Sequence, residues 1–347
     1  MSFNVSLTGL QGAQKAMDAV QQNIANVSTP DYKKLEALFT AMDFSGPNNV
    51  PFNPGGVKTD IVTSGNMFAD NRVNQAVASA ANEAAYNEGL KALGDGISTK
   101  NVEQAFTNFM NSSQDLMTNT ADPVKQEAFK LSGQSFSTEL KGLGDQLGTV
   151  TRQITANRDF KQIQLDNLQQ EMSSLTAGPV TAESKAAVEA MAKQVMMLTG
   201  TIDGYNRVLS GVIPPITSMY TLAAEKVVLG SNESYGQPIL DVRGGFNFDP
   251  ANMGNVKALT EFGSQAFNRD MGVMNTNIGS KIQYSNMTNE AAQAAAAAAL
   301  KDQQAITGVD LVEQTVKMAQ YQNMYNANAK AIQIQNEMLG TLLNIKA

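Results

Sequence analysis

The stretch from Leu10 to Val27, LQGAQKAMDAVQQNIANV, repeats its apolar side chains at alternating steps of three and four residues. This spacing places them on one face of a helix, as in the seam of a coiled coil. The pattern reaches back to Phe3, and Pro30 ends it because proline favours an extended conformation at the preceding Thr29. We therefore expect a helix from about Phe3 to Val27. Its seam consists of Leu10, Ala13, Met17, Val20, Ile24 and Val27.

Two interpretations of this seam are open. Periodicity indicates a buried face without naming what covers it, so the seam can pack on the core of its own chain or on a partner. The remaining faces of the helix are polar but almost uncharged, with Gln11, Gln14, Gln21, Gln22 and Asn23.

A second heptad series occupies the C-terminus. From Asn289 we expect helix to the end of the chain, interrupted at Gly308. The apolar series is Leu311, Met318, Tyr325, Ile332 and Leu339, and its companion positions are Tyr321, Asn328, Gln335 and Leu342. Buried Asn and Gln weaken a coiled coil but discriminate between registers and between partners.

The region between the two ends begins with a connector and continues as helices. Residues 44–65 contain Pro47, Pro51 and Pro54, which exclude a helix, and residues 57–62 can form one short strand. Residues 74–210 have helical periodicity, and Asp122 before Pro123 is typical of a helix N-cap. Helix breaks are expected at Gly94–Gly96, Asp122–Pro123 and Gly178–Pro179.

Between Gly211 and Gly272 the helical periodicity gives way to short apolar runs that are separated by glycines. Strands are expected at Lys226–Leu229, Ile239–Val242 and Phe246–Phe248. The sequence thus predicts a mainly α fold, with N- and C-terminal coiled-coil helices that can be paired with each other, an elongated helical bundle and a small β-containing insertion. The expected domains are a terminal helical domain (1–40 and 300–347), a helical body with an extended connector (41–210 and 273–299) and the insertion (211–272).

Composition excludes several classes of function. The net charge of −7 and the lack of Lys and Arg clusters argue against a nucleic-acid surface. The absence of Cys and His removes disulfides, thiolate chemistry and the commonest general base and metal ligand. Aromatic residues make up only 6%, so we expect long helices with Ala and Met in narrow seams. We expect neither a cleavable signal peptide nor a membrane span, since no long apolar block occurs.

Three candidate sites for chemistry were weighed. The glycines Gly142, Gly144 and Gly148 are misplaced for a dinucleotide fingerprint and lie in a helical context. The run Gly279–Lys281 lacks the order of a phosphate loop. Asp241 and Asp249 flank a glycine turn and can in principle pair or bind a hard cation, but a role as solvated turn residues explains them far better. We therefore predict no catalytic, cofactor-binding or metal-binding residues and no enzymatic activity.

Both ends of the chain carry motifs that resemble one family. Ser6–Lys34, SLTGLQGAQKAMDAVQQNIANVSTPDYKK, resembles the N-terminal signature of flagellar rod, hook and hook-associated proteins. Gly308–Ile345, GVDLVEQTVKMAQYQNMYNANAKAIQIQNEMLGTLLNI, resembles their C-terminal signature. The positions that carry the resemblance include Asn23, Ile24, Ala25, Asn26, Thr29, Pro30, Tyr321 and Asn328.

The interior helps to choose within this family. Residues 108–147 resemble the helical region of hook-associated protein 1, the hook–filament junction protein, whereas rod and hook proteins are mostly β between similar ends. The resemblance implies an extracellular structural subunit, exported by the flagellar type III apparatus, that polymerises through its terminal helices. Its implied partners are further copies of itself, the hook protein, a later junction protein, the filament and an export chaperone.

Two departures from the family pattern bear on this interpretation. Asp31 stands where the family usually has Gly, although Asp tolerates a left-handed turn better than most residues. The central region is reduced to about residues 211–272. The alternatives are a rod or hook subunit, a secreted enzyme on a flagellar scaffold and a cytosolic coiled-coil adaptor.

Overall fold

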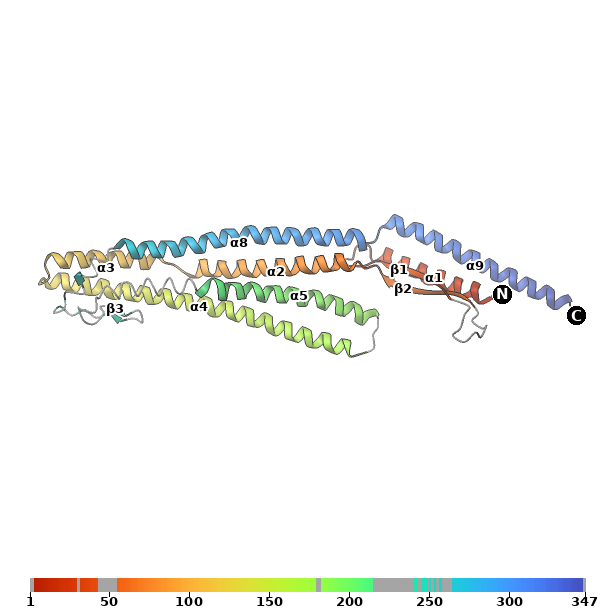
Figure 1. The fold of residues 1–347 in the computed structure, drawn as a ribbon, viewed down its shortest axis with the longest axis horizontal. Helices are drawn as coiled ribbons and strands as arrows, with labels where there is room; N and C mark the ends of the chain where they lie inside the picture. The colour runs from red at the N-terminus through yellow and green to blue at the C-terminus, as the bar shows by residue number, and fades with distance from the viewer. Residues whose placement is uncertain are drawn as a thin grey trace. The chain divides into compact units, whose positions relative to one another are not determined.

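The fold is mainly α, as the sequence predicts (Figure 1). The structure is a computed structural model that describes residues 3–29, 32–42, 55–178, 182–214, 240–241, 245–246, 248, 250, 253, 256–257 and 264–345. Its helices are α1 (Phe3–Ala25), α2 (Met67–Gly96), α3 (Lys100–Thr118), α4 (Pro123–Thr176), α5 (Ala182–Gly211), α8 (Ser264–Thr307) and α9 (Leu311–Ile345). Its strands are β1 (Leu35–Met42), β2 (Gly56–Thr63), β3 (Leu240–Asp241) and β4 (Gly245–Phe246).

The chain divides into two compact units. The terminal unit comprises Met1–Val73 and Ala297–Ala347, so it combines both ends of the chain. The helical body comprises Asn74–Ala296. The division falls within α2 and α8, and each unit has its own packing.

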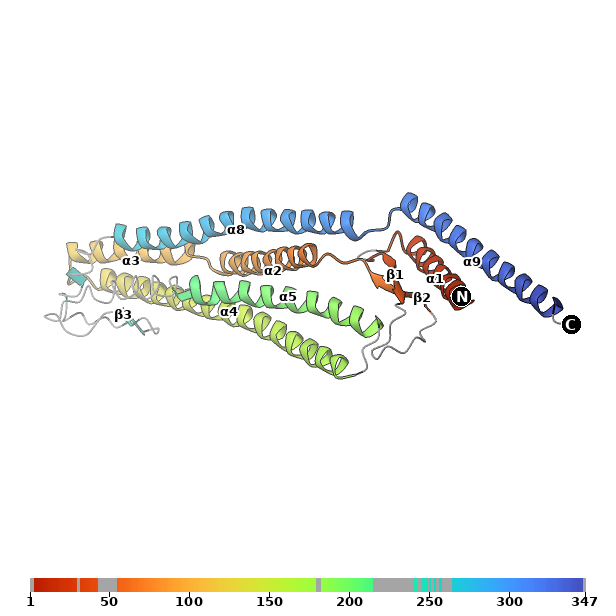
Figure 2. The same ribbon diagram turned by 45° about the vertical axis from the view of Figure 1, so that its right-hand side comes forward.

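In the terminal unit, α1 and α9 lie side by side and run antiparallel (Figure 2). Asn23 near the end of α1 contacts Gln314 near the start of α9, whereas Gly9 lies against Asn328. The two contacts are thus separated by the same number of residues on each helix. The predicted pairing of N- and C-terminal helices is therefore present within one chain.

A β-hairpin packs on α1 in the same unit. Strands β1 and β2 are antiparallel, with a register that runs from Leu35 opposite Thr63 to Met42 opposite Gly56. The Val57 backbone N–H donates to Thr8 Oγ1 of α1 at 3.1 Å. Strand β2 confirms the predicted strand over residues 57–62, but β1 was not predicted. Residues 43–54, with the three connector prolines, lie outside the described residues.

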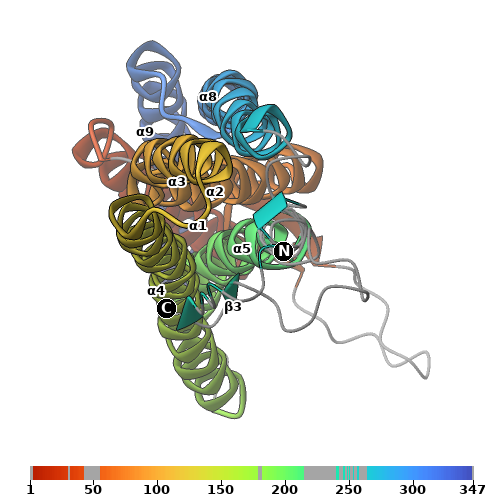
Figure 3. The same cartoon turned by 90° about the vertical axis from the view of Figure 1, so that its left-hand side faces the viewer.

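The helical body contains an antiparallel α3–α4 pair and an antiparallel α4–α5 pair. In Figure 3, which looks along these helices, α3 lies between α4 and α8. Helix α4 has 54 residues, which corresponds to about 80 Å at 1.5 Å per residue. Helix α2 runs beside α5, and a Cβ on Gly200 or Gly204 of α5 would meet the α2 backbone. These two helices therefore approach more closely than other residues at these positions would allow.

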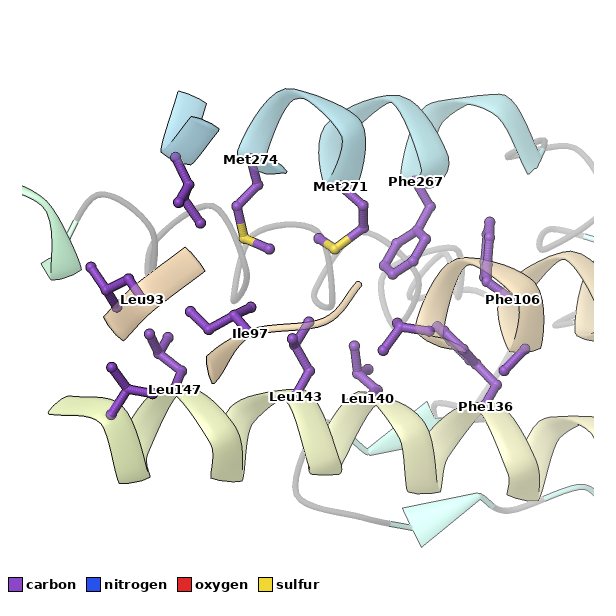
Figure 4. Packing of buried hydrophobic residues seen from close by; sticks show 14 of the residues in the cluster. Leu93, Ile97, Phe106, Phe136, Leu140, Leu143, Leu147, Phe267, Met271 and Met274 are labelled. Atoms are coloured by element: carbon purple, nitrogen blue, oxygen red, sulfur yellow. The ribbon is translucent and has the colours of Figure 1, made fainter. Parts of the chain in front are cut away.

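A phenylalanine cluster forms the core of the body (Figure 4). The rings of Phe106 (α3), Phe136 (α4) and Phe267 (α8) have centroids 4.3 to 5.5 Å apart, and all three residues are buried. Met271 and Met274 of α8 extend the cluster toward Leu143 and Leu147 of α4. The expectation of seams filled by Ala and Met was thus incomplete, because phenylalanine supplies the largest buried side chains here.

Most predicted helix boundaries agree with the structure. Helices end at Gly96, Thr118, Thr176 and Thr307, beside the four predicted breaks. Asp122 Oδ1 accepts a hydrogen bond from the Val124 N–H at 2.9 Å, with Pro123 in the first turn, which confirms the predicted N-cap.

The predicted β-containing insertion is shorter than expected at its C-terminal side. Helix α8 begins at Ser264, so residues 264–272 are helical. The physical reason is burial of Phe267, Met271, Met274 and Ile278, which recur at helical spacing on the Phe cluster. Strands β3 and β4 form an antiparallel pair with Leu240 opposite Phe246. The strand predicted at Lys226–Leu229 lies outside the described residues.

Candidate assembly interface

Helix α1 packs in the terminal unit mainly through small residues. Its buried positions are Ser6, Gly9, Gly12, Ala13, Ala16, Ala19, Val20 and Asn23. A Cβ on Gly9 would lie 2.8 Å from Asn328 Oδ1, and one on Gly12 would lie 3.3 Å from the ring of Phe39. Small side chains thus let the backbone of α1 approach both α9 and the hairpin.

The predicted apolar seam of α1 is only partly covered. Ala13 and Val20 are buried, whereas Leu10, Met17 and Ile24 are half-buried. Val27 follows the end of the helix and is exposed. The larger seam residues therefore lie at the edge of the packed face, where a neighbouring subunit can reach them.

The seam of α9 shows the same partial cover. Met318, Tyr325 and Ile332 are half-buried, Leu311 and Leu339 are about half exposed, and the Leu342 side chain lies outside the described residues. Further exposed apolar side chains on α9 are Val312, Val316, Met324, Ile334 and Met338. Val312 with Val316 and Ile334 with Met338 stand four residues apart and so share a face, and exposed apolar side chains grouped in this way are typical of a protein interaction surface.

Two companion positions of α9, and Gln314 seven residues before the first of them, contact the rest of the terminal unit. Half-buried Tyr321 packs against Phe39 of β1, with ring centroids 5.9 Å apart. Half-buried Asn328 lies against Gly9, and buried Gln314 contacts Asn23. Gln335 Oε1 is buried without a hydrogen-bond partner among the described residues.

Asn23 makes four hydrogen bonds in the described terminal unit. It is fully buried, and its amide nitrogen donates to the Leu35 carbonyl at 2.8 Å and to Gln314 Oε1 at 2.9 Å. Its amide oxygen accepts from the Leu35 N–H at 2.7 Å and from the Tyr32 hydroxyl at 3.0 Å. Both hydrogens and both lone pairs of the amide are therefore used. Burial also raises the pKa of Tyr32, which remains a donor.

The other motif residues near Asn23 form a local turn. The Asn26 amide donates to the Gln22 carbonyl at 2.9 Å, and Asn26 Oδ1 accepts from the Thr29 hydroxyl at 3.2 Å. Ile24 is half-buried and Ala25 and Thr29 are exposed, whereas Pro30 lies outside the described residues. These contacts lie at and just beyond the end of α1 at Ala25.

Four charged side chains form a closed ring between α9 and the start of β1. Lys34 Nζ lies 3.4 Å from a carboxylate oxygen of both Glu36 and Glu313. Lys317 Nζ lies 3.8 Å from Glu36 and 2.7 Å from Glu313. The hydrogen bond from Lys317, opposed by burial, lowers the pKa of Glu313. Burial would lower the pKa of Lys317, but its hydrogen bond and attraction to Glu313 raise it.

We expect Glu313→Gln to reduce the free energy of unfolding at pH 7 by about 0.5 kcal/mol or less, since solvent screens a partly exposed ring. The folded-state pKa of Glu313 is lowered, so its contribution is present above the ordinary value of 4.5 and is lost as pH falls through the lowered pKa. The raised pKa of Lys317 has the opposite sign, so its contribution persists below 10.5 and is lost as pH rises further.

Urea unfolding of the variant and the unaltered protein at pH 7 and pH 3 checks this expectation. Glu337→Gln is the matched control, because Glu337 lies on the same helix and has no ion pair among the described residues. A difference for Glu313→Gln that is as large at pH 3 as at pH 7 would contradict the assignment.

The described residues contain no group of three or more acidic, His or Cys side chains that could hold a metal. No described helix is both apolar and long enough to cross a membrane.

In the body, burial and the Glu88 carboxylate raise the pKa of Tyr205 to about 12, so its hydroxyl stays protonated and donates to Glu88 at 2.9 Å. Asp249 lies outside the described residues, which leaves the Asp241–Asp249 pair untested.

Three features of this unit were missed in the sequence. The small-residue face of α1 was overlooked, although Ser6, Gly9, Ala13, Ala16 and Val20 also recur at steps of three and four. Asn23 was named only as a motif residue of the resemblance, and its contact with Gln314 has no local signal because the two residues are 291 positions apart. The charge ring joins segments that are similarly distant, since Lys34 and Glu313 are 279 positions apart.

A comparison with protein families gives one match at the C-terminus. Residues 304–345 match the Flagellar basal body rod FlgEFG protein C-terminal family. The match covers α9 and the last residues of α8, and searches of curated proteins and of solved structures gave no match. It supports the superfamily of flagellar rod and hook axial proteins, and with it a structural role in the flagellum. It does not extend to the hook-associated proteins in particular.

Proposed function

We propose that this protein is a structural subunit of the bacterial flagellum that joins hook to filament by helical polymerisation of its terminal helices. The observation that carries the proposal is the antiparallel pairing of α1 with α9, the helix that matches the flagellar rod family. The pair leaves Met17, Ile332 and Leu339 partly uncovered, as a subunit that packs on copies of itself requires.

The helical body is our reason for choosing the junction over the rod or hook. The resemblance seen in the sequence implies a mostly β interior for rod and hook proteins, whereas the described part of residues 74–296 is predominantly helical. The matched family favours the alternative, a rod or hook subunit. The experiment below separates the two.

The same proposal implies a location and partners. The subunit would be exported by the flagellar type III apparatus and would act outside the cell. It would contact the hook protein on one side and a later junction protein or the filament on the other. An export chaperone would hold it before secretion. No described feature favours the alternatives of a secreted enzyme or a cytosolic adaptor.

Deleting the gene should leave cells with completed hooks, no filaments and flagellin released into the medium. A junction subunit is needed only after the hook is finished, so its loss stops assembly at that point. Electron microscopy of isolated flagella and immunoblotting of the medium for flagellin check this. Complementation with the unaltered gene is the control.

Each other phenotype has a definite meaning. Cells that lack hooks as well would show a rod or hook subunit. Cells with normal filaments would overturn the structural role. Retention of the protein in the cytosol of wild-type cells would favour the adaptor instead.

A further inference from the structure

Helix α1 buries little apolar surface for its length. Among its fully buried residues only Val20 has a large apolar side chain, and the others are small or polar. Glycine is also the poorest helix former after proline, and α1 contains Gly9 and Gly12 within its first three turns. In proteins a helix draws most of its stability from the packing of its apolar face rather than from helix propensity. Its order must therefore depend on specific contacts with the rest of the terminal unit.

The contacts of Asn23 come from three separate segments. Tyr32 and Leu35 belong to the chain that leads into β1, Gln314 belongs to α9, and Asn23 itself lies in the last turns of α1. All four hydrogen bonds exist only when the three segments are in place together. The charge ring joins the neighbouring residues Lys34 and Glu313 of two of these segments.

We propose that Asn23 and the adjacent charge ring form a latch that makes the order of α1 depend on α9, and the order of α9 depend on α1. Asn23 acts as a positioning residue, because it holds Gln314 and Leu35 and thereby presents the seams of both helices. The inference concerns the isolated subunit, so it stands or falls independently of the proposed flagellar role.

The physical reason for this dependence is the cost of an orphaned amide. If the hydrogen bond to Gln314 is lost, one buried hydrogen of Asn23 Nδ2 has no acceptor. This destabilises α1, which has little apolar burial to compensate. If the Asn23 side chain is removed, Gln314 Oε1 loses its donor. The Nε2 of Gln314 already lacks a partner among the described residues, so its whole amide is then buried without a hydrogen bond there. Either loss favours opening of both helices rather than of one.

The test is amide hydrogen exchange, followed by mass spectrometry, on the full-length protein. The variants are Asn23→Ala, Gln314→Met and the double variant, where Met keeps the length of Gln without its oxygen. Asn26→Ala is the matched control, because among the described residues the Asn26 side chain bonds only within its own turn, to Gln22 and Thr29. Peptides from α3 and α4 report whether the helical body remains folded.

We expect Gln314→Met to speed exchange in α1 about tenfold, and Asn23→Ala to do the same in α9. The double variant should exchange little faster than either single variant, since each already breaks the latch. The control should leave α9 unchanged. Exchange confined to the substituted helix, additive effects of the two substitutions, or an α1 that already exchanges fully in the unaltered protein would each overturn the proposal.

Discussion

Met17→Asp should reduce incorporation of the protein into flagella by at least about 100-fold. The side chain is half-buried at the edge of the α1 seam, where a neighbouring subunit would complete its cover. Burying an unpaired carboxylate there costs several kcal/mol, and each 1.4 kcal/mol lowers an association constant tenfold. Because every subunit contact carries the same defect, the polymer should not form.

The measurement is an immunoblot of flagella isolated from a deletion strain that expresses the variant. Gln14→Asp is the matched control, since it adds the same charge to an exposed position of the same helix. Ile332→Asp repeats the test on α9, with the exposed Gln333→Asp as its control. Circular dichroism of the purified variants should show an intact helical body. Normal incorporation of both seam variants would show that these seams are not assembly contacts.

Features encoded by local periodicity could be predicted from the sequence. The heptads around Met17 and Ile332 predicted two long terminal helices, and Asp122 with Pro123 predicted the start of α4. These signals are local because apolar spacing, caps and breakers act within a few residues. The pairing of the two ends came from the family resemblance rather than from either helix alone.

The burial of α1 could not be predicted in the same way. Large apolar residues such as Leu10 and Met17 mark a seam, yet the structure buries Gly9, Gly12 and Ala16 more completely. The reason is that backbone approach to α9 and the hairpin depends on distant partners, Asn328 and Thr59, that no window of sequence contains. A face of small residues carries a weak periodic signal, which the stronger apolar pattern hides.

The phenylalanine core was underestimated for a related reason. An aromatic content of 6% suggested narrow seams, but composition does not reveal where the aromatic residues gather. Phe106, Phe136 and Phe267 lie on three helices and meet only after the chain has folded. The helices could be predicted individually, whereas their common core is a product of tertiary packing.

Phe106→Ala should lower the free energy of unfolding of the helical body by about 3 to 5 kcal/mol, the usual cost of removing a buried aromatic side chain. Phe106 is fully buried, and its ring lies 5.1 Å from that of Phe136 and 4.3 Å from that of Phe267. The substitution therefore removes from α3 a ring that contacts both α4 and α8. For a unit of this size the midpoint of thermal unfolding should fall by about 10 °C.

Urea and thermal unfolding, followed by far-ultraviolet circular dichroism, measure this effect. Phe160→Ala removes the same side chain from α4 at a position where 58% of it is exposed, so it should change stability by about 0.5 kcal/mol or less. Because the terminal unit has its own packing, its transition should be unaffected by either substitution. Equal effects of the two substitutions would mean that the Phe cluster does not stabilise the body. A shift of both transitions by Phe106→Ala would mean that the two units unfold as one.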